Sequence, residues 1–113
     1  MGITMHIIKT IQNQILHISN AKSFRRALEE AIDLGINLSH ADLRYKNLMI
    51  ANLDSANFTH ADFTGSNLTG ANLTECNLNK AIFTDCTLTG TQFDTTNIKF
   101  INLPQSQWIK AVA

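Results

Sequence analysis

Few residues in this sequence have the type and spacing that catalysis or metal binding requires. It contains four histidines and two cysteines, and Cys76 and Cys86 are too far apart for a CxxC metal-binding pair. It has no glycine-rich phosphate loop, no Ser-His-Asp set and no isolated carboxylate pair. We therefore expect that the chain is not an enzyme and binds no cofactor or metal.

Length and composition narrow the class of protein further. The chain has 113 residues and zero net charge, which fits one domain and does not suggest a nucleic-acid binder. No apolar run approaches the roughly 20 residues of a membrane helix, and the N-terminus lacks the order of a signal peptide. We expect a cytoplasmic protein with no membrane partner and no direct nucleic-acid partner.

A five-residue period dominates residues 36–103. A large apolar residue returns at every fifth position, usually with a small residue two positions before it and Asn or Asp between the two. The large residues are Leu38, Leu43, Leu48, Leu53, Phe58, Phe63, Leu68, Leu73, Leu78, Phe83, Leu88, Phe93, Ile98 and Leu103. This period fits neither a helix nor a long strand. It predicts a chain that turns a corner in every unit, with the large and small residues inward, and whose coils stack about 4.8 Å apart.

The repeat resembles the pentapeptide-repeat family, whose pattern is A(D/N)LXX. Ala51-Asn52-Leu53 and Ala61-Asp62-Phe63 match this pattern outright. The resemblance implies an all-β solenoid, a right-handed quadrilateral β-helix with four pentapeptides per coil and about three and a half coils.

Some positions depart from the pattern. Lys46 occupies a small inward position, so we expect the first coil to be distorted or capped there. The Asn or Asp of the pattern is missing at three later positions, Ile82, Thr87 and Gln92, so the turns of the third coil depart from the pattern.

The pattern decays after Phe100, and Pro104 cannot donate to a backbone ladder. We expect residues 104–113 to form a C-terminal cap or a dimerisation tail. The candidate cap or dimer contacts are Phe100, Trp108, Ile109 and Val112.

The N-terminal residues should close the other end of the coil. Residues 1–20 are expected to form a β-hairpin that turns at Gln12-Asn13. Residues 21–35 are expected to form an amphipathic capping helix that starts at Asn20 or Ser19 and ends at Gly35. Two ion pairs are predicted on its outer face, Arg25–Glu29 and Arg26–Glu30. The alternative role of hairpin and helix is to dock a partner.

Residues twenty apart should stack into ladders in a coil of four pentapeptides. One ladder would contain His40, His60, Lys80 and Phe100. Two stacked imidazoles can share a metal ion in principle, but no third ligand is expected and Lys80 would oppose a cation. A second ladder, Asn37, Asn57, Asn77 and Asn97, is expected to bond along the stack. Cys76 and Cys86 fall at small inward positions and should act as apolar fillers.

Charge is segregated along the chain, because the body of the repeat is acidic and both of its ends are basic. Three acids should lie on one wall, Asp54, Glu75 and Asp94, and three on the opposite wall, Asp42, Asp62 and Asp85. These six residues are the predicted partner-binding residues.

Members of the pentapeptide-repeat family include DNA mimics that bind gyrase. The resemblance therefore implies a non-catalytic protein-binding module that inhibits a DNA-handling or host-defence protein by mimicry of duplex DNA. One chain would span roughly 17 Å, or about five base pairs, and a homodimer would double this length. The alternative is a structural or assembly element that uses its rod and end caps, favoured if Tyr45, Met49 and Ile50 form one apolar patch.

Overall fold

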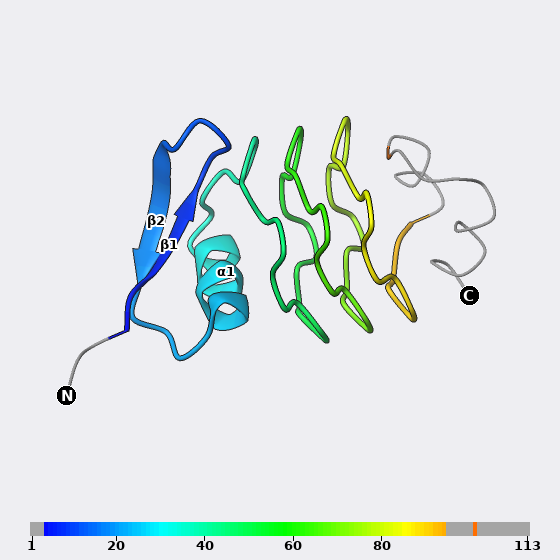
Figure 1. Ribbon diagram of the computed structural model, residues 1–113, viewed down its shortest axis with the longest axis horizontal. Helices are drawn as coiled ribbons and strands as arrows, with labels where there is room; N and C mark the ends of the chain where they lie inside the picture. The colour runs from blue at the N-terminus through cyan, green and yellow to red at the C-terminus, as the bar shows by residue number, and fades with distance from the viewer. Residues whose placement is uncertain (1–3, 95–100, 102–113) are drawn as a thin grey trace.

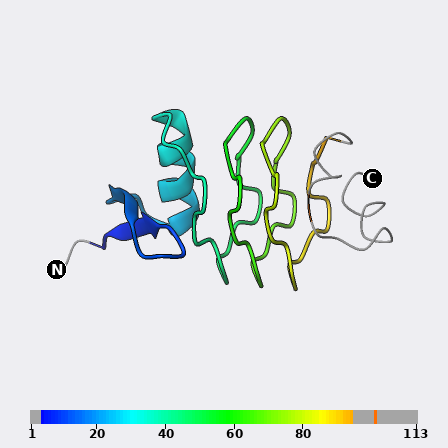
Figure 2. The same ribbon diagram turned by 90° about the horizontal axis from the view of Figure 1, so that it is seen from above.

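The computed structural model describes residues 4–94 and 101. Its regular elements are strand β1 (His6–Lys9), strand β2 (Ile15–Ser19) and helix α1 (Phe24–Asp33). These elements lie at one end of the molecule, and the chain then runs through successive stacked coils (Figures 1 and 2). The repeat region pairs through isolated bridges rather than through further named strands.

β1 and β2 form an antiparallel hairpin. Ile7 is the register partner of Ile18, and a β-bulge follows Ile8. The chain turns where the sequence predicts it, because Asn13 adopts a φ of 69° and donates its N–H to the Thr10 carbonyl at 2.9 Å. Asparagine tolerates this left-handed conformation better than most residues.

α1 begins later than the sequence suggested. Its N-cap is Ser23, whose hydroxyl accepts the Arg26 N–H at 3.1 Å, so the expected cap at Asn20 or Ser19 was wrong. Ser19 instead ends β2, and its hydroxyl accepts the Ala21 N–H at 3.0 Å. Gly35 follows the C-cap with a φ of 75°, as expected for a glycine that ends a helix.

Only one of the two predicted ion pairs on α1 occurs. Arg25 contacts Glu29 at 3.1 Å, which confirms the first pair. Arg26 also contacts Glu29, at 3.3 Å, so the predicted pair with Glu30 was wrong. Glu30 lies 2.7 Å from Nε2 of His17 on β2, and this hydrogen bond lowers the pKa of the Glu30 carboxyl.

From residue 36 onward, residues twenty apart pair in parallel. The bridges are Asp42↔Asp62, Asn47↔Asn67, Asn52↔Asn72, Asn57↔Asn77, Asp62↔Ile82, Asn67↔Thr87 and Asn72↔Gln92. The Leu53 N–H bonds to the Asn72 carbonyl and the Asn72 N–H to the Ala51 carbonyl, both at 2.9 Å. One coil therefore contains twenty residues, as four pentapeptides require.

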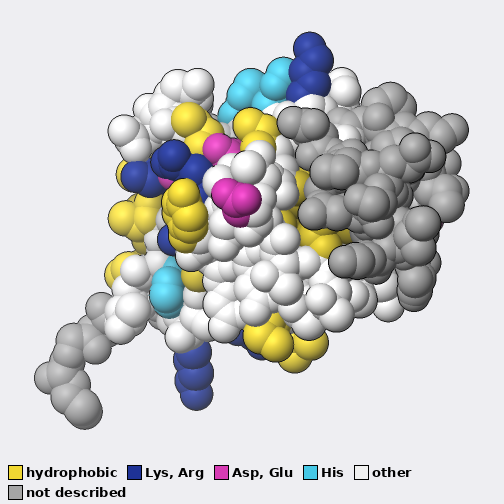
Figure 3. Space-filling view, turned by 45° about the vertical axis from the view of Figure 1, so that its right-hand side comes forward, with side chains coloured by type: hydrophobic (Ala, Val, Ile, Leu, Met, Phe, Trp, Pro, Cys, Tyr) yellow, Lys and Arg dark blue, Asp and Glu magenta, His cyan; other side chains and the backbone are white. Residues whose placement is uncertain are grey.

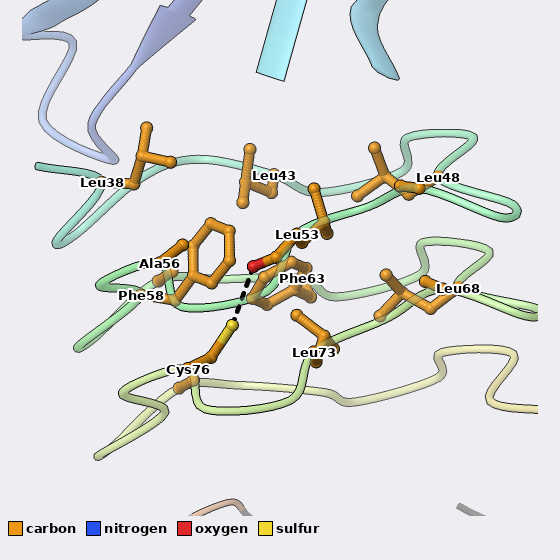
Figure 4. Close-up of a cluster of buried hydrophobic side chains, with 14 of the residues drawn as sticks. Leu38, Leu43, Leu48, Leu53, Ala56, Phe58, Phe63, Leu68, Leu73 and Cys76 are labelled. Carbon is orange, nitrogen blue, oxygen red and sulfur yellow. Dashed lines mark hydrogen bonds between the residues drawn. The ribbon is translucent and has the colours of Figure 1, made fainter. Parts of the chain in front are cut away.

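The large residue of each pentapeptide points into the stack, as predicted. From Leu38 to Phe93 every member of the series is buried, and the side chains form columns between the walls (Figure 4). Phe63 stacks on Phe83 with ring centroids 4.8 Å apart, and Phe58 meets Phe63 edge to face at 5.1 Å. Each buried Leu or Phe contributes roughly 1.5–3 kcal/mol to folding by its removal from water.

A tight turn forms each corner between pentapeptides. At most corners the N–H of the small residue bonds to the carbonyl of the preceding large residue, as in Ala51 N–H to Leu48 at 3.1 Å. The residue before the small one has a positive φ, for example 55° at Ile50. Such turns favour glycine or asparagine at this position, but here it is occupied mostly by other residues.

The expected irregularities do not interrupt the stack. Lys46 extends its ammonium group over the Phe24 ring of α1, 4.3 Å from the centroid, and its N–H bonds to Ser66 Oγ at 2.9 Å. The side chain thus ties the capping helix to the first coil. Ile82, Thr87 and Gln92 still form their bridges, because the ladder uses backbone groups that every one of these residues supplies.

Candidate protein-binding surface

Asp54, Glu75 and Asp94 lie on one side of the coils, and we call this set the acidic wall. Asp54 and Asp94 occupy equivalent positions two coils apart. The Glu75 N–H donates to Asp94 Oδ2 at 2.6 Å, and the Ser55 hydroxyl donates to Glu75 Oε2 at 3.4 Å. Within residues 4–94 no ion pair involves any of the three carboxylates. Their charge is therefore available to a partner.

Of the three predicted acids of the opposite wall, Asp42 is the one that an ion pair makes less available. Asp42 forms a two-point contact with the Arg44 guanidinium, at 2.9 and 3.1 Å, and these bonds hold the pKa of Asp42 below its ordinary value. Asp62 Oδ1 accepts the Thr64 N–H at 2.9 Å. Asp85 is exposed at a corner. On the face shown in Figure 3, acidic side chains lie beside Lys or Arg side chains and do not form an unbroken stripe.

The histidine ladder forms as predicted. The rings of His40 and His60 stack with centroids 4.7 Å apart and 3° between their planes. Among the described residues no three His, Cys, Asp or Glu side chains converge as metal ligands would. Phe100, the last predicted member of this ladder, lies outside the described residues.

Hydrogen bonds link part of the asparagine ladder. Asn57 Nδ2 donates to Asn37 Oδ1 at 3.1 Å, and Asn57 Oδ1 accepts the Thr59 N–H at 3.0 Å. These amides stabilise turns and adjacent coils. Asn97, the predicted last member, lies outside the described residues.

Both cysteines have little capacity for nucleophilic chemistry. Their S–H groups donate to backbone carbonyls, Cys76 to Leu53 and Cys86 to Phe63, each at 2.9 Å (Figure 4 shows the first bond). Burial raises the pKa of Cys76 to about 12 and that of Cys86 to about 11. The reactive thiolate is therefore strongly disfavoured at neutral pH.

The apolar residues Tyr45, Met49 and Ile50 do not form one patch. Met49 and Ile50 line a hollow of about 420 Å³ beside Phe24. Tyr45 borders a different hollow of about 300 Å³, with its ring lying over Gly65 one coil further along. The observation that would have favoured the structural alternative is therefore absent from this region.

Sequence reasoning missed one exposed apolar surface. The outward face of the hairpin carries Met5, Ile7, Ile15 and Ile18, which are about half exposed. The alternation of Met5 and Ile7 was the signal that could have identified it. The four predicted cap or dimer contacts, Phe100, Trp108, Ile109 and Val112, lie outside the described residues. The described part of the chain includes no helix long and apolar enough to cross a membrane.

A period of twenty residues, an inward apolar column and outward polar walls define a repeat protein. A family model of the pentapeptide repeat region matches residues 36–111, about two thirds of the chain. The protein therefore belongs to the pentapeptide-repeat family, and the resemblance read from the sequence is confirmed. The match continues past Leu103, where the sequence pattern placed the end of the repeats. Comparison with curated proteins returned no match.

Proposed function

We propose that this protein is a non-catalytic protein-binding module. In this proposal it inhibits a DNA-handling or host-defence protein in the cytoplasm by presenting its acidic wall in place of duplex DNA. We also infer that its coils form the right-handed quadrilateral β-helix of its family, which membership of the family and the twenty-residue pairing support. Protein recognition, rather than chemistry, is favoured because the Cys76 thiol is buried, the Cys86 thiol is half-buried, and the imidazoles of His40 and His60 stack on each other.

One observation carries the proposal: the acidic wall has no cationic partner within the described residues. Hydrogen bonds to Glu75 and Asp94 hold these carboxylates in place. A rigid array of charge loses little conformational entropy when it binds. It would therefore suit the basic groove of a protein that binds DNA.

The density of charge limits how strongly one copy can bind. From Asp42 to Asp94 the chain advances by about two and a half coils, or roughly 12 Å. Duplex DNA carries about seven charges in that distance. The same stretch of this protein has five acids without an ion pair, Asp54, Asp62, Glu75, Asp85 and Asp94, opposed by Lys46 and Lys80. With roughly half the charge density of DNA, the interaction should be sensitive to salt.

The test is capture of DNA-handling proteins from a bacterial lysate on immobilised protein, at about 50 mM and about 300 mM salt. A captured protein should be released by the higher salt and displaced by duplex DNA. The variant Asp54→Asn/Glu75→Gln/Asp94→Asn should lose it. The matched control is Asp42→Asn/Arg44→Gln, which removes an ion pair from the other wall without a change in net charge. This control variant should still capture the same protein.

Two results would count against the proposal. Capture that is insensitive to salt and to duplex DNA would mean that the target does not bind through a DNA site. Equal loss of capture in the triple variant and in the control would remove the role of the acidic wall.

A further inference from the structure

A hollow of about 300 Å³ lies between the outward side of β1 and the first coil. Its lining residues are Ile7, Lys9, Asp42, Arg44, Tyr45 and Lys46. Backbone bonds join the two segments, because the Asp42 N–H donates to the Lys9 carbonyl at 2.7 Å and Thr10 pairs with Ala41. β1 therefore lies beside the first coil (Figure 1). The size of the hollow falls at the lower end of the range for small-molecule sites.

The lining of this hollow carries three cations and one carboxylate. Asp42 neutralises Arg44 through their two-point contact. Lys9 and Lys46, in contrast, form no ion pair within residues 4–94. The hollow therefore has an excess of two positive charges. The zero net charge of the whole chain conceals this excess, because that sum includes residues that lie far apart in the fold.

Neutral groups hold the two unpaired cations in position. The Lys9 ammonium donates to Asn13 Oδ1 at 2.9 Å, and the Lys46 ammonium lies 4.3 Å from the centroid of the Phe24 ring. Neither partner cancels the charge, and each leaves the ammonium group further N–H donors. Two cations that are already positioned lose little conformational entropy when they bind an anion.

The third cation, Arg44, is directed toward acids. Its Nε and Nη2 donate to Asp42. The pKa of Arg44 is raised by this hydrogen bond and further by the charge of Asp62, one coil along the stack. An anionic ligand should therefore bind nearer to Lys9 and Lys46 than to Arg44.

Tyr45 gives the hollow an aromatic surface beside these charges. Its side chain is 75% exposed, and Ile7, which is 49% exposed, adds an apolar contact. Nucleobases stack on exposed aromatic side chains of this kind. A phosphate monoester carries close to two negative charges at neutral pH, which matches the excess positive charge of the lining. A ligand that combines a phosphate with a flat ring thus fits both features.

We propose that this hollow binds a nucleotide, with its phosphate at Lys9 and Lys46 and its base against Tyr45. The source is either a free nucleotide or the end of a single-stranded nucleic acid, because both present the same two groups. No member of the acidic wall lines the hollow, so this proposal does not rest on the proposed function.

Titration of the isotope-labelled protein with adenosine monophosphate, from about 0.1 to about 10 mM and followed by NMR, tests the proposal. Backbone signals around Lys9, Tyr45 and Lys46 should shift, and raised salt should weaken the binding. Lys9→Gln/Lys46→Gln should weaken it at least about tenfold. The matched control is Lys22→Gln/Lys80→Gln, which removes two exposed lysines that do not line the hollow, and this variant should bind normally. Lys9→Gln alone leaves the contact of Lys46 with Phe24 intact and should still weaken binding about fivefold.

Variants of Tyr45 test the position of the base. Tyr45→Ala should weaken the binding of adenosine monophosphate at least about fivefold and leave the weaker binding of inorganic phosphate unchanged. Tyr45→Phe keeps the ring and should bind as the natural protein does. A short single-stranded oligonucleotide distinguishes the two sources. Tighter binding of the oligonucleotide than of the mononucleotide would identify a nucleic-acid end, and equal or weaker binding would identify a free nucleotide.

Three results would overturn the proposal. The first is that neither the mononucleotide nor the oligonucleotide shifts the signals around the hollow. The second is equal binding by Lys9→Gln/Lys46→Gln and by its control. The third is unchanged binding of adenosine monophosphate by Tyr45→Ala, because the base would then lie elsewhere. Asp54→Asn/Glu75→Gln/Asp94→Asn should bind the nucleotide normally, which separates this test from that of the acidic wall.

Discussion

Two glycines occupy the same position in their turns, and alanine substitutions there separate two losses of stability. One comes from backbone strain in the turn, and the other comes from a clash with a neighbouring side chain. Gly65 and Gly90 have similar left-handed conformations, with φ of 73° and 67°. Alanine at either site should cost about 1 kcal/mol through backbone strain alone. The surroundings differ: a Cβ on Gly65 would lie 2.4 Å from two ring carbons of Tyr45, whereas a Cβ on Gly90 would meet nothing nearer than 3.8 Å.

The additional cost at Gly65 follows from the burial of Tyr45. An aromatic side chain offers about 150–250 Å², and Tyr45 is 75% exposed. About a quarter of its surface, roughly 50 Å², is covered and would be exposed if the ring moved away. At about 25 cal/mol per Å² this is about 1 kcal/mol. Gly65→Ala should therefore destabilise the protein by about 2 kcal/mol and Gly90→Ala by about 1 kcal/mol.

Urea unfolding followed by circular dichroism measures both free energies, and a third variant tests the cause. In a Tyr45→Ala background, Gly65→Ala should cost only about 1 kcal/mol, because no ring remains to be displaced. Equal effects of Gly65→Ala and Gly90→Ala in the natural background would refute the reasoning. An unchanged effect of Gly65→Ala without Tyr45 would also refute it, and would show that corner strain differs between coils.

Three further predictions concern strain, pH and thiol reactivity. Ile50→Asn should stabilise the protein by about 0.5–1 kcal/mol in the same urea assay, because a β-branched residue with φ of 55° is strained; an unchanged or lower stability would contradict this. The Arg44 guanidinium lowers the pKa of Asp42 below 3.8, so this carboxylate adds stability above that pH and loses it as the pH falls through the lowered value. Asp42→Asn should therefore flatten the fall of stability below about pH 4, and an unchanged dependence of stability on pH would contradict this. Because burial raises both thiol pKa values, to about 12 and about 11, iodoacetamide at pH 8 should label Cys76 and Cys86 only on unfolding, and rapid labelling of the folded protein would show that the coils open locally.

Much of the repeat could be predicted because the position of a residue within the five-residue period determines whether its side chain points into the interior. Once a chain turns a corner every five residues, the large and small residues must point inward, and residues twenty apart must stack. This reasoning placed the Leu and Phe column and the pairing of His40 with His60, and both are confirmed. It also located the acidic wall. The order of residues does not show, however, whether the carboxylates of this wall form ion pairs.

Tertiary structure decided the features that depend on choices between nearby groups. Ser19 and Ser23 both have side chains that suit an N-cap. Because Ser19 is the last residue of β2, Ser23 is the residue that caps α1. Glu30 pairs with His17 instead of Arg26 because β2 packs beside the helix.

The hairpin illustrates the same division most clearly. Its alternation shows which side chains share a face but does not say which face meets the core. The sequence by itself determined the coil and the residues that fill it, because a backbone period acts locally and repeats. Only the packed structure decided that Ile7 and Ile18 point outward, because that choice depends on hydrogen bonds and contacts between segments distant in the chain.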